Sequence, residues 1–391
     1  MVTALPGREP LLRALIDICG PDFAREAAAP DMVAGHLASF VAAPATTRAV
    51  MDTLRLAAER GLAVVARGSG SKIDWGAPPQ GIDLLLDTRR LDGIWDHGPA
   101  GMTAQIGTGT PVRAVQAALA LRGQRLAVDP PSPEATIGGM LAVNESGPLR
   151  HRYGSPAAQV DRISYVDIEG MPAESDGENG SPGIAEVAGV IVSAAVRLQP
   201  LPAARRWVNV PVATPLQVHD VVEATLAQRL SPSAIEVDLP VPAGSRTATQ
   251  PAGALAVLLE GDAADAGERA RRLATVLGGA TAVTPTAPRW WGRYPFGRDD
   301  VALRIAVSIA DLHAAVYALR DVAGMAVPVR GSAGMGTVHA VLPGTLAPER
   351  VEGILDAVRG VLLARGGRCV VVAAPPPIST TVAMAGRRDL F

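Results

Sequence analysis

Apolar residues in this chain follow helical spacing in some segments and form short continuous runs in others. A spacing of three to four residues predicts a helix from Glu9 to Cys19, which ends before a Gly-Pro pair. A second helix is predicted to begin after Thr46 or Thr47, either of which can cap it, and to end at Gly61. The apolar run at 62–66 then predicts a strand.

The first half of the chain continues with alternating strands and helices. Further strands are predicted at residues 82–87, 103–107 and 162–169. Between them, residues 111–121 have helical spacing, with Thr110 as the N-cap and Pro111 at the first helical position. The mixture of short strands and helices predicts an α+β domain.

A proline-rich segment, Pro200-Leu201-Pro202, predicts a hinge between two domains. Beyond it, strands are predicted at 207–212, 254–260, 302–307 and 338–341, and helices at 216–229, 264–277, 309–323 and 347–365. This order predicts a second α+β domain, ferredoxin-like or related to it, with helices packed on a sheet. The expected division is an N-terminal helical arm at 1–37, a first domain at 38–202, a second domain at 203–374 and a tail at 375–391.

Composition narrows the classes of function. The chain has 391 residues, of which 48% are hydrophobic, and a formal net charge of -2, so it lacks the basic excess of a nucleic-acid-binding surface. Cys19 and Cys369 belong to no metal-ligand spacing, so we expect neither a disulfide framework nor a metal site. We find no signal peptide and no apolar run of membrane-spanning length, which favours a cytoplasmic protein with no membrane span.

The most informative segment follows the strand at 62–66 and reads Arg67-Gly68-Ser69-Gly70-Ser71-Lys72. Gly68 and Gly70 allow positive φ and a close approach to a ligand, so that consecutive N–H groups can converge on an anion. Lys72 is the only lysine of the chain and would add a positive charge. The pattern indicates a phosphate-binding loop, although a strand followed by a plain glycine turn has the same local sequence.

A second glycine-rich segment follows a proline-rich loop at 129–133. It contains Ala135-Thr136-Ile137-Gly138-Gly139 and continues to Asn144. The glycine pair permits close backbone approach, Thr136 can offer its hydroxyl to a phosphate, and Asn144 can cap a helix or contact a ligand. Taken alone, this segment is equally compatible with a loop whose glycines serve turns only.

Together these segments, in this order and followed by Ser146-Gly147-Pro148 and Arg152-Tyr153-Gly154, carry a resemblance. They resemble the PCMH-type FAD-binding domain of the vanillyl-alcohol oxidase superfamily, and within it the chain looks like the FAD-binding subunits of bacterial glycolate oxidases. The similarity continues through residues 289–296 and 331–344 and covers roughly residues 38–377. It implies a two-domain fold whose first domain binds FAD, and whose second, ferredoxin-like domain covers the flavin.

In this family the first glycine loop holds the FAD pyrophosphate, and the Gly-Gly segment lies along the adenine and ribitol side. The resemblance therefore assigns cofactor binding to the following residues: Arg67, Gly68, Ser69, Gly70, Ser71, Lys72, Pro131, Ala135, Thr136, Gly138, Gly139, Asn144, Ser146, Gly147, Tyr153, Gly189 and Val190. No histidine or cysteine lies in the first loop, so the FAD is expected to be non-covalent. The resemblance identifies no catalytic residue.

The chain departs from the family at two places. Residues 174–191 are shorter than the corresponding family segment and are acidic, with only Gly189-Val190-Ile191 retained clearly. We expect the part through Gly183 to be a surface loop, because Asp176 and Glu178 would repel a nearby pyrophosphate. The C-terminus lacks a family segment that lies on the flavin side. Both departures bear on whether FAD is bound.

Other residues have plain structural interpretations. His151 is expected to be a solvated loop residue, and His339, in an apolar run, to be a satisfied core or interface histidine. The segment 289–296 is rich in arginine and aromatic residues, which would either bind a carboxylate or hold two domains together.

Three functions follow. The first is an FAD-binding oxidoreductase subunit that transfers electrons from a small organic acid, a 2-hydroxy acid. Its partners would be a second flavoprotein and iron–sulfur subunits. The second is a flavin-depleted structural or regulatory subunit. The third is a stand-alone biosynthetic tailoring enzyme that uses the same fold.

Overall fold

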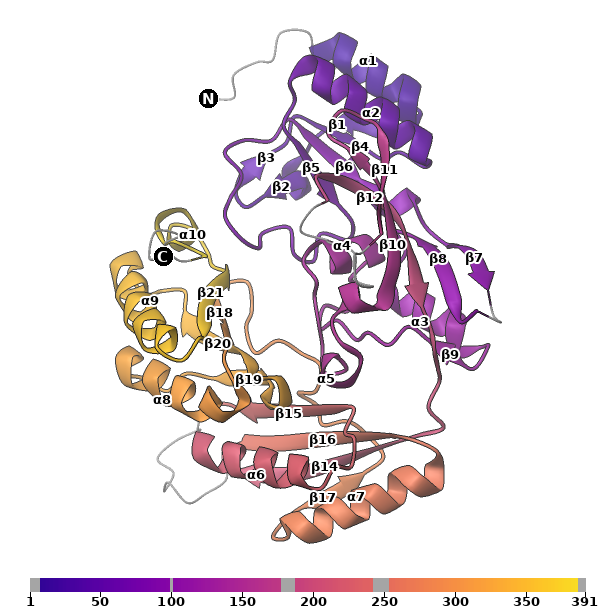
Figure 1. Ribbon diagram of the computed structural model, residues 1–391. Coiled ribbons are helices and arrows are strands. Elements are labelled where there is room, and N and C mark those ends of the chain that lie inside the picture. The colour runs from indigo at the N-terminus through magenta and orange to yellow at the C-terminus, as the bar shows by residue number, and fades with distance from the viewer. Residues whose placement is uncertain (1–7, 99–100, 177–186, 242–252, 386–391) are drawn as a thin grey trace. The chain divides into compact units, whose positions relative to one another are not determined.

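The computed structural model describes residues 8–98, 101–176, 187–241 and 253–385 (Figure 1). The chain divides into two compact units. Unit 1 comprises residues 1–74, 78–146 and 154–201, and unit 2 comprises 75–77, 147–153 and 202–391. The division after Leu201 falls in the proline-rich segment, whereas two short segments of the first half belong to unit 2.

A mixed four-stranded sheet forms the N-terminal part of unit 1. Its strand order is β1 (Ala24–Glu26), β4 (Phe40–Ala42), β6 (Leu84–Asp87) and β5 (Val64–Arg67), and only β1 is antiparallel to its neighbour. The helices α1 (Arg8–Cys19) and α2 (Thr47–Arg60) supply apolar residues to its core. Thr46 caps α2 by accepting a hydrogen bond from the Ala49 N–H, and Gly61 ends it at φ 62°, as the sequence predicts.

A five-stranded antiparallel sheet forms the rest of unit 1. Its order is β11 (Pro172–Asp176), β10 (Val160–Asp167), β12 (Gly189–Arg197), β8 (Thr103–Gly107) and β7 (Ile94–Gly98). The helices α3 (Val112–Ala120) and α4 (Ile137–Ala142) pack on it. The short elements of unit 1 are η1 (Ala29–Asp31), β2 (Met32–Val33), β3 (His36–Leu37), η2 (Thr88–Arg90), β9 (Gln124–Arg125), η3 (Pro156–Gln159) and β13 (Gln199–Pro200).

Two local predictions in this sheet are wrong. Thr110 does not cap α3, because its hydroxyl donates to the Gly107 carbonyl at 2.7 Å and Pro111 occupies the N-cap. Glu174 to Asp176 do not form a loop, because they lie in β11, where Asp176 and Glu174 pair with Arg162. Residues 177–186, which include Glu178 and Gly183, lie outside the described residues.

Unit 2 contains the same βαββαβ arrangement twice, as expected for a ferredoxin-like fold. The first copy is β14 (Ala204–Val212), α6 (Pro215–Ala227), β15 (Ala234–Leu239), β16 (Gly253–Gly261), α7 (Ala263–Leu277) and β17 (Ala282–Thr284). The second copy is β18 (Asp300–Ala306), α8 (Leu312–Ala323), β19 (Val329–Ser332), β20 (Thr337–Pro343), α9 (Pro348–Leu363) and β21 (Arg368–Ala373). The strand order, β17-β14-β16-β15-β19-β20-β18-β21, shows that antiparallel pairing of β15 with β19 joins the copies into one eight-stranded sheet.

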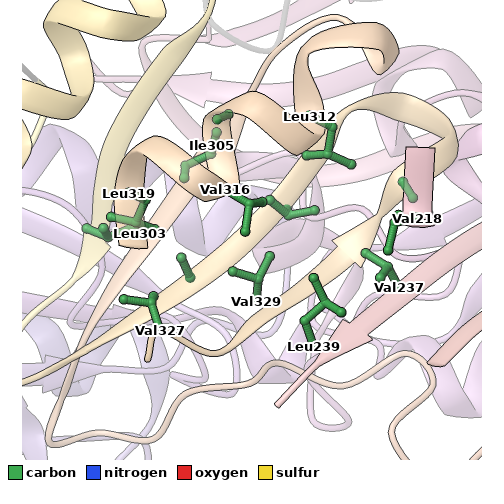
Figure 2. Packing of buried hydrophobic residues seen from close by; sticks show 14 of the residues in the cluster. Val218, Val237, Leu239, Leu303, Ile305, Leu312, Val316, Leu319, Val327 and Val329 are labelled. Carbon is green, nitrogen blue, oxygen red and sulfur yellow. The ribbon is translucent and has the colours of Figure 1, made fainter. Parts of the chain in front are cut away.

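The core of unit 2 lies between this sheet and the four long helices. Figure 2 shows Val218 of α6 and Leu312, Val316 and Leu319 of α8 packed against strand residues such as Val237. Burial of each such side chain stabilises the fold by about 1.5–3 kcal/mol. The remaining short elements of unit 2 are α5 (Arg150–Tyr153), η6 (Ile309–Asp311), η7 (Ala333–Met335) and α10 (Ile378–Thr381).

Candidate functional site

The glycine- and serine-rich loop follows β5 directly, at the edge of the mixed sheet of unit 1. Gly70 adopts φ 79°, a left-handed conformation that favours glycine. Within the part of the chain that the structure describes, no backbone N–H from Gly68 to Lys72 donates a hydrogen bond to another protein group. These five consecutive N–H groups therefore have no protein partner among the described residues, and their convergence on an anion stays a prediction.

Gly68 is required for a different reason from the expected one. It does not adopt a positive φ, so that part of the prediction is wrong. A Cβ at position 68 would instead lie 2.2 Å from Oγ1 of Thr136, so glycine allows the loop to pack against the start of α4. Gly138 has the same role in α4, where a Cβ would lie 1.6 Å from Oγ1 of Thr108. The two glycine segments therefore pack closely against their neighbours inside unit 1.

The first N–H groups of α4 are already hydrogen-bonded inside the protein. Ile137 and Gly138 donate to the carbonyls of Thr110 and Thr108, at 2.9 and 2.8 Å. Gly139 donates to the hydroxyl of Thr136, the N-cap residue, at 3.2 Å. The Gly-Gly segment thus offers space rather than free backbone donors, and the free donors are those of the 68–72 loop.

These elements line a cavity of about 140 Å³ that lies entirely within unit 1. Loops at the ends of β5 and β8, the helix α4 and the first residues of β12 form its walls. The lining residues are Ala66, Arg67, Gly68, Thr88, Thr108, Gly138, Gly139, Ala142, Val187, Gly189, Val190 and Ile191. Six of the residues assigned from the sequence are among them: Arg67, Gly68, Gly138, Gly139, Gly189 and Val190.

Sequence reasoning missed the other half of this lining. Thr108 belongs to the sequence Gly107-Thr108-Gly109-Thr110, which directly follows a predicted strand and offered a usable signal. A Cβ on Gly109 would lie 2.2 Å from the Thr88 carbonyl oxygen, so this turn packs closely on η2. Ala66, Ala142 and Val187 gave no such signal, because small and aliphatic residues are common everywhere.

Lys72 is not a free cation in this site. Its Nζ lies 2.5 Å from Oε2 of Glu145, and the side chains are 5% and 0% exposed. Oε1 of Glu145 accepts hydrogen bonds from the N–H and the hydroxyl of Ser132, at 3.1 and 2.6 Å. The lysine charge expected to face a phosphate is therefore balanced by a buried carboxylate.

The Arg67 side chain lies in an ion-pair network rather than in the loop. Its guanidinium bridges Asp31, at 3.1 Å, and Asp87, at 3.2 Å, and both carboxylates are buried. Burial raises the pKa of Asp31, but hydrogen bonds from Arg25, the Ala28 N–H and Arg67 outweigh it and lower the pKa to about 2. The pKa of Asp87 is also lowered, because hydrogen bonds from Arg89 outweigh burial. Arg67 thus holds η1 and β6 to β5.

Several other assigned residues have partners inside the protein. Ala135 is buried and donates its N–H to the Ser132 carbonyl. Asn144, at φ 49°, accepts a hydrogen bond from the Ala157 N–H, and the Ser146 hydroxyl donates to the Asn144 carbonyl. Pro131 lies in the loop before α4. Gly147 and Tyr153 belong to unit 2, where the Tyr153 hydroxyl lies 3.5 Å from Oε2 of Glu260.

Unit 2 has its own cluster of aromatic and basic residues. Tyr294 stacks on Phe296 with ring centroids 4.8 Å apart, and His339 lies 5.0 Å from Tyr294. Burial and the nearby Arg304 lower the pKa of His339 to about 4, so it is neutral at pH 7. His151 is not a solvated loop residue as expected: it lies half-buried in α5, with Nδ1 3.2 Å from the Gly334 carbonyl oxygen.

Comparison with known proteins identifies the class of the first unit. A model of the FAD binding domain family matches residues 38–174, the segment that contains both glycine-rich loops and most of the cavity. Residues 38–174 therefore match an FAD-binding domain, and this match supports FAD as the cofactor. The N–H groups of the 68–72 loop are of the kind that binds the phosphates of such a group, and Gly68 joins this loop to the cavity.

Among curated proteins, the chain is similar to an uncharacterized FAD-linked oxidoreductase of Mycobacterium tuberculosis, with 31% identity over 116 residues. It is 35% identical over 111 residues to the glycolate oxidase subunit GlcE of Escherichia coli. These alignments cover 30% and 28% of this chain, and 25% and 31% of the relatives, respectively. The chain thus matches between a quarter and a third of the length of these relatives.

Solved structures show the fold over nearly the whole chain. p-Cresol methylhydroxylase superposes with a TM-score of 0.73 at 14% identity, covering 93% of this chain and 89% of that one. An alkyldihydroxyacetonephosphate synthase superposes with a TM-score of 0.72 at 16% identity, covering 93% and 80%. The expected two-domain α+β fold of the PCMH type is confirmed. None of the described helices combines the length and hydrophobicity that a membrane-spanning helix requires.

Proposed function

We propose that this chain is the FAD-binding subunit of an oxidoreductase of the glycolate oxidase type. In this proposal it takes part in electron transfer from a 2-hydroxy acid, together with a second flavoprotein and an iron–sulfur subunit. The observation that carries the proposal is the run of five N–H groups at residues 68–72 that have no partner among the described residues, beside a cavity lined by Arg67 and by glycine, threonine and aliphatic residues.

Each part of the site has a distinct role in binding. The loop amides donate to the pyrophosphate, and Gly70 permits the turn that makes them converge. Gly138 and Gly139 keep the wall formed by α4 free of side chains, and the apolar start of β12 excludes water. Because the loop contains no histidine or cysteine, the cofactor is held non-covalently.

The bound FAD would supply two-electron redox chemistry. Among the residues that line the described cavity, Arg67 alone is ionisable, and its guanidinium is paired with Asp31 and Asp87. The cavity wall therefore offers no side chain able to accept a proton from a substrate. This favours a role in holding the cofactor, with the substrate proton removed elsewhere in an assembly.

The visible absorption spectrum of the purified protein, followed by titration with FAD, tests this function. We expect flavin bands, or uptake of added FAD, in the wild type. G70V should abolish uptake, because valine is strained at φ 79° and would deform the loop. G123V is a matched control in unit 1: Gly123 also has a positive φ, 67°, and no atom lies within 4 Å of its added Cβ.

Two results would overturn the proposal. A folded wild-type protein that is colourless and ignores added FAD would favour the flavin-depleted structural subunit. A G70V variant that retains the flavin would show that the 68–72 loop does not hold it. Co-purification of a flavin-containing partner with the chain would support the multi-subunit arrangement.

A further inference from the structure

The ion pair of Lys72 and Glu145 joins segments that are far apart in the sequence. Lys72 also donates to the hydroxyl of its neighbour Ser71, at 2.9 Å. Glu145 accepts from Ser132 of the proline-rich loop and donates its own N–H to the Met140 carbonyl, at 2.9 Å. Glu145 thus connects the glycine loop and the proline-rich loop through its buried carboxylate, and the end of α4 through its backbone N–H.

Burial makes this connection strongly dependent on both partners. A charged group removed from water is stable only when an opposite charge and hydrogen bonds replace its hydration. Here the Lys72 side chain is 5% exposed and the Glu145 side chain is not exposed at all. Removing either partner takes this ion pair away from a buried charge, so each residue helps to hold the other in position.

The same geometry disfavours direct binding of a phosphate by Lys72. To reach an anion in the cavity, the lysine would have to leave Glu145, whose buried carboxylate would then lose this 2.5 Å ion pair. The cavity lining includes neither residue. The backbone N–H groups of the loop, in contrast, are already free.

We propose that Lys72 and Glu145 are positioning residues, which together fix the 68–72 loop so that its backbone amides, and not the lysine, bind the pyrophosphate of FAD. This inference rests on the proposed role of the loop in FAD binding. It means that Glu145, which lies outside the 68–72 loop, influences the affinity for FAD by holding that loop in position.

A double-mutant cycle separates the two roles of the lysine. We expect K72M and E145Q each to weaken FAD binding roughly tenfold, and the double variant to be no weaker than either, because both remove the same pair. If Lys72 contacted the pyrophosphate, K72M would weaken binding, whereas E145Q would leave it unchanged or tighten it by releasing the cation. That opposite response to E145Q would overturn the inference. Fluorescence titration of the apo-protein with FAD measures all four affinities.

Hydrogen exchange in the protein without FAD gives a second readout. K72M and E145Q should both speed exchange in peptides that span residues 68–73, because the loop has lost its anchor. R48M is the matched control, since it removes the exposed ion pair of Arg48 with Asp52 in the same unit and should change nothing. Unchanged exchange in K72M would refute the anchoring role. Failure of the wild type to bind FAD would instead refute the proposed function, and the exchange data would still test the pair.

Discussion

Replacing Gly68 with alanine tests whether this glycine serves the protein or the ligand. The new Cβ would lie 2.2 Å from Oγ1 of Thr136 and 3.3 Å from its Cβ and Cγ2. Oγ1 would have to move by about 1 Å to reach an ordinary contact distance. That movement breaks its 3.2 Å hydrogen bond from the Gly139 N–H, which caps α4.

The magnitude follows from these contacts. Loss of the cap costs about 1 kcal/mol, and the remaining overpacking costs about 1–2 kcal/mol, so G68A should lower the free energy of unfolding by about 2–3 kcal/mol. T136A alone should cost about 1 kcal/mol. In the double variant the colliding Oγ1 and Cγ2 are absent, so its cost should stay near that of T136A.

Urea unfolding followed by circular dichroism measures the three free energies, and FAD titration of the same proteins supplies the second half of the test. If glycine is needed only for packing, the double variant binds FAD as T136A does. If FAD binding stays weak in the double variant, the Gly68 backbone must approach the ligand directly. Additive unfolding energies, with the double variant about 3–4 kcal/mol less stable than the wild type, would refute the packing argument.

Two further predictions concern the stability of unit 1. Gly61→Ala should lower the free energy of unfolding by about 1 kcal/mol, because Gly61 ends α2 at φ 62°, where alanine is strained. No atom lies within 4 Å of an added Cβ, so the cost is purely conformational, and an unchanged urea denaturation midpoint would contradict the prediction. The pKa of Asp31 is lowered from 3.8 to about 2, so its ionised carboxylate should stabilise the folded state by about 2 kcal/mol above pH 4, and this contribution should disappear as the pH falls toward 2. Urea denaturation at several pH values should show that D31N loses less unfolding free energy over this range than the wild type does.

The sequence predicted the elements whose signals are local. Thr46 and Gly61 mark the ends of α2, and both caps form as expected, because each depends on a few consecutive residues. β1 was not predicted, because it has only three residues and its partner β4 follows in the sequence only after η1, β2 and β3. The pairing of β15 with β19 is likewise invisible in the sequence, since nearly a hundred residues separate their partners.

The candidate site shows the same limit. The 68–72 loop was found because glycine and serine at this spacing have a recognisable backbone role, whereas the partners of its side chains were not. Nothing in the sequence pairs Lys72 with Glu145, or Arg67 with Asp31, because these contacts depend on how distant segments pack. The lysine was expected to face a phosphate, but its charge is buried and paired with Glu145.

The joined sheet of unit 2 also bears on how such a domain can arise. β15 and β19 are the second strands of their βαββαβ copies, so each copy alone would have an unpaired edge at the same place. Their antiparallel pairing is compatible with a two-fold axis between the copies. A polypeptide with only one copy could pair its unpaired edge strand with the same strand of a second molecule, in a symmetric homodimer with an eight-stranded sheet. Unit 2 has the strand order that such a dimer would have, within one continuous chain.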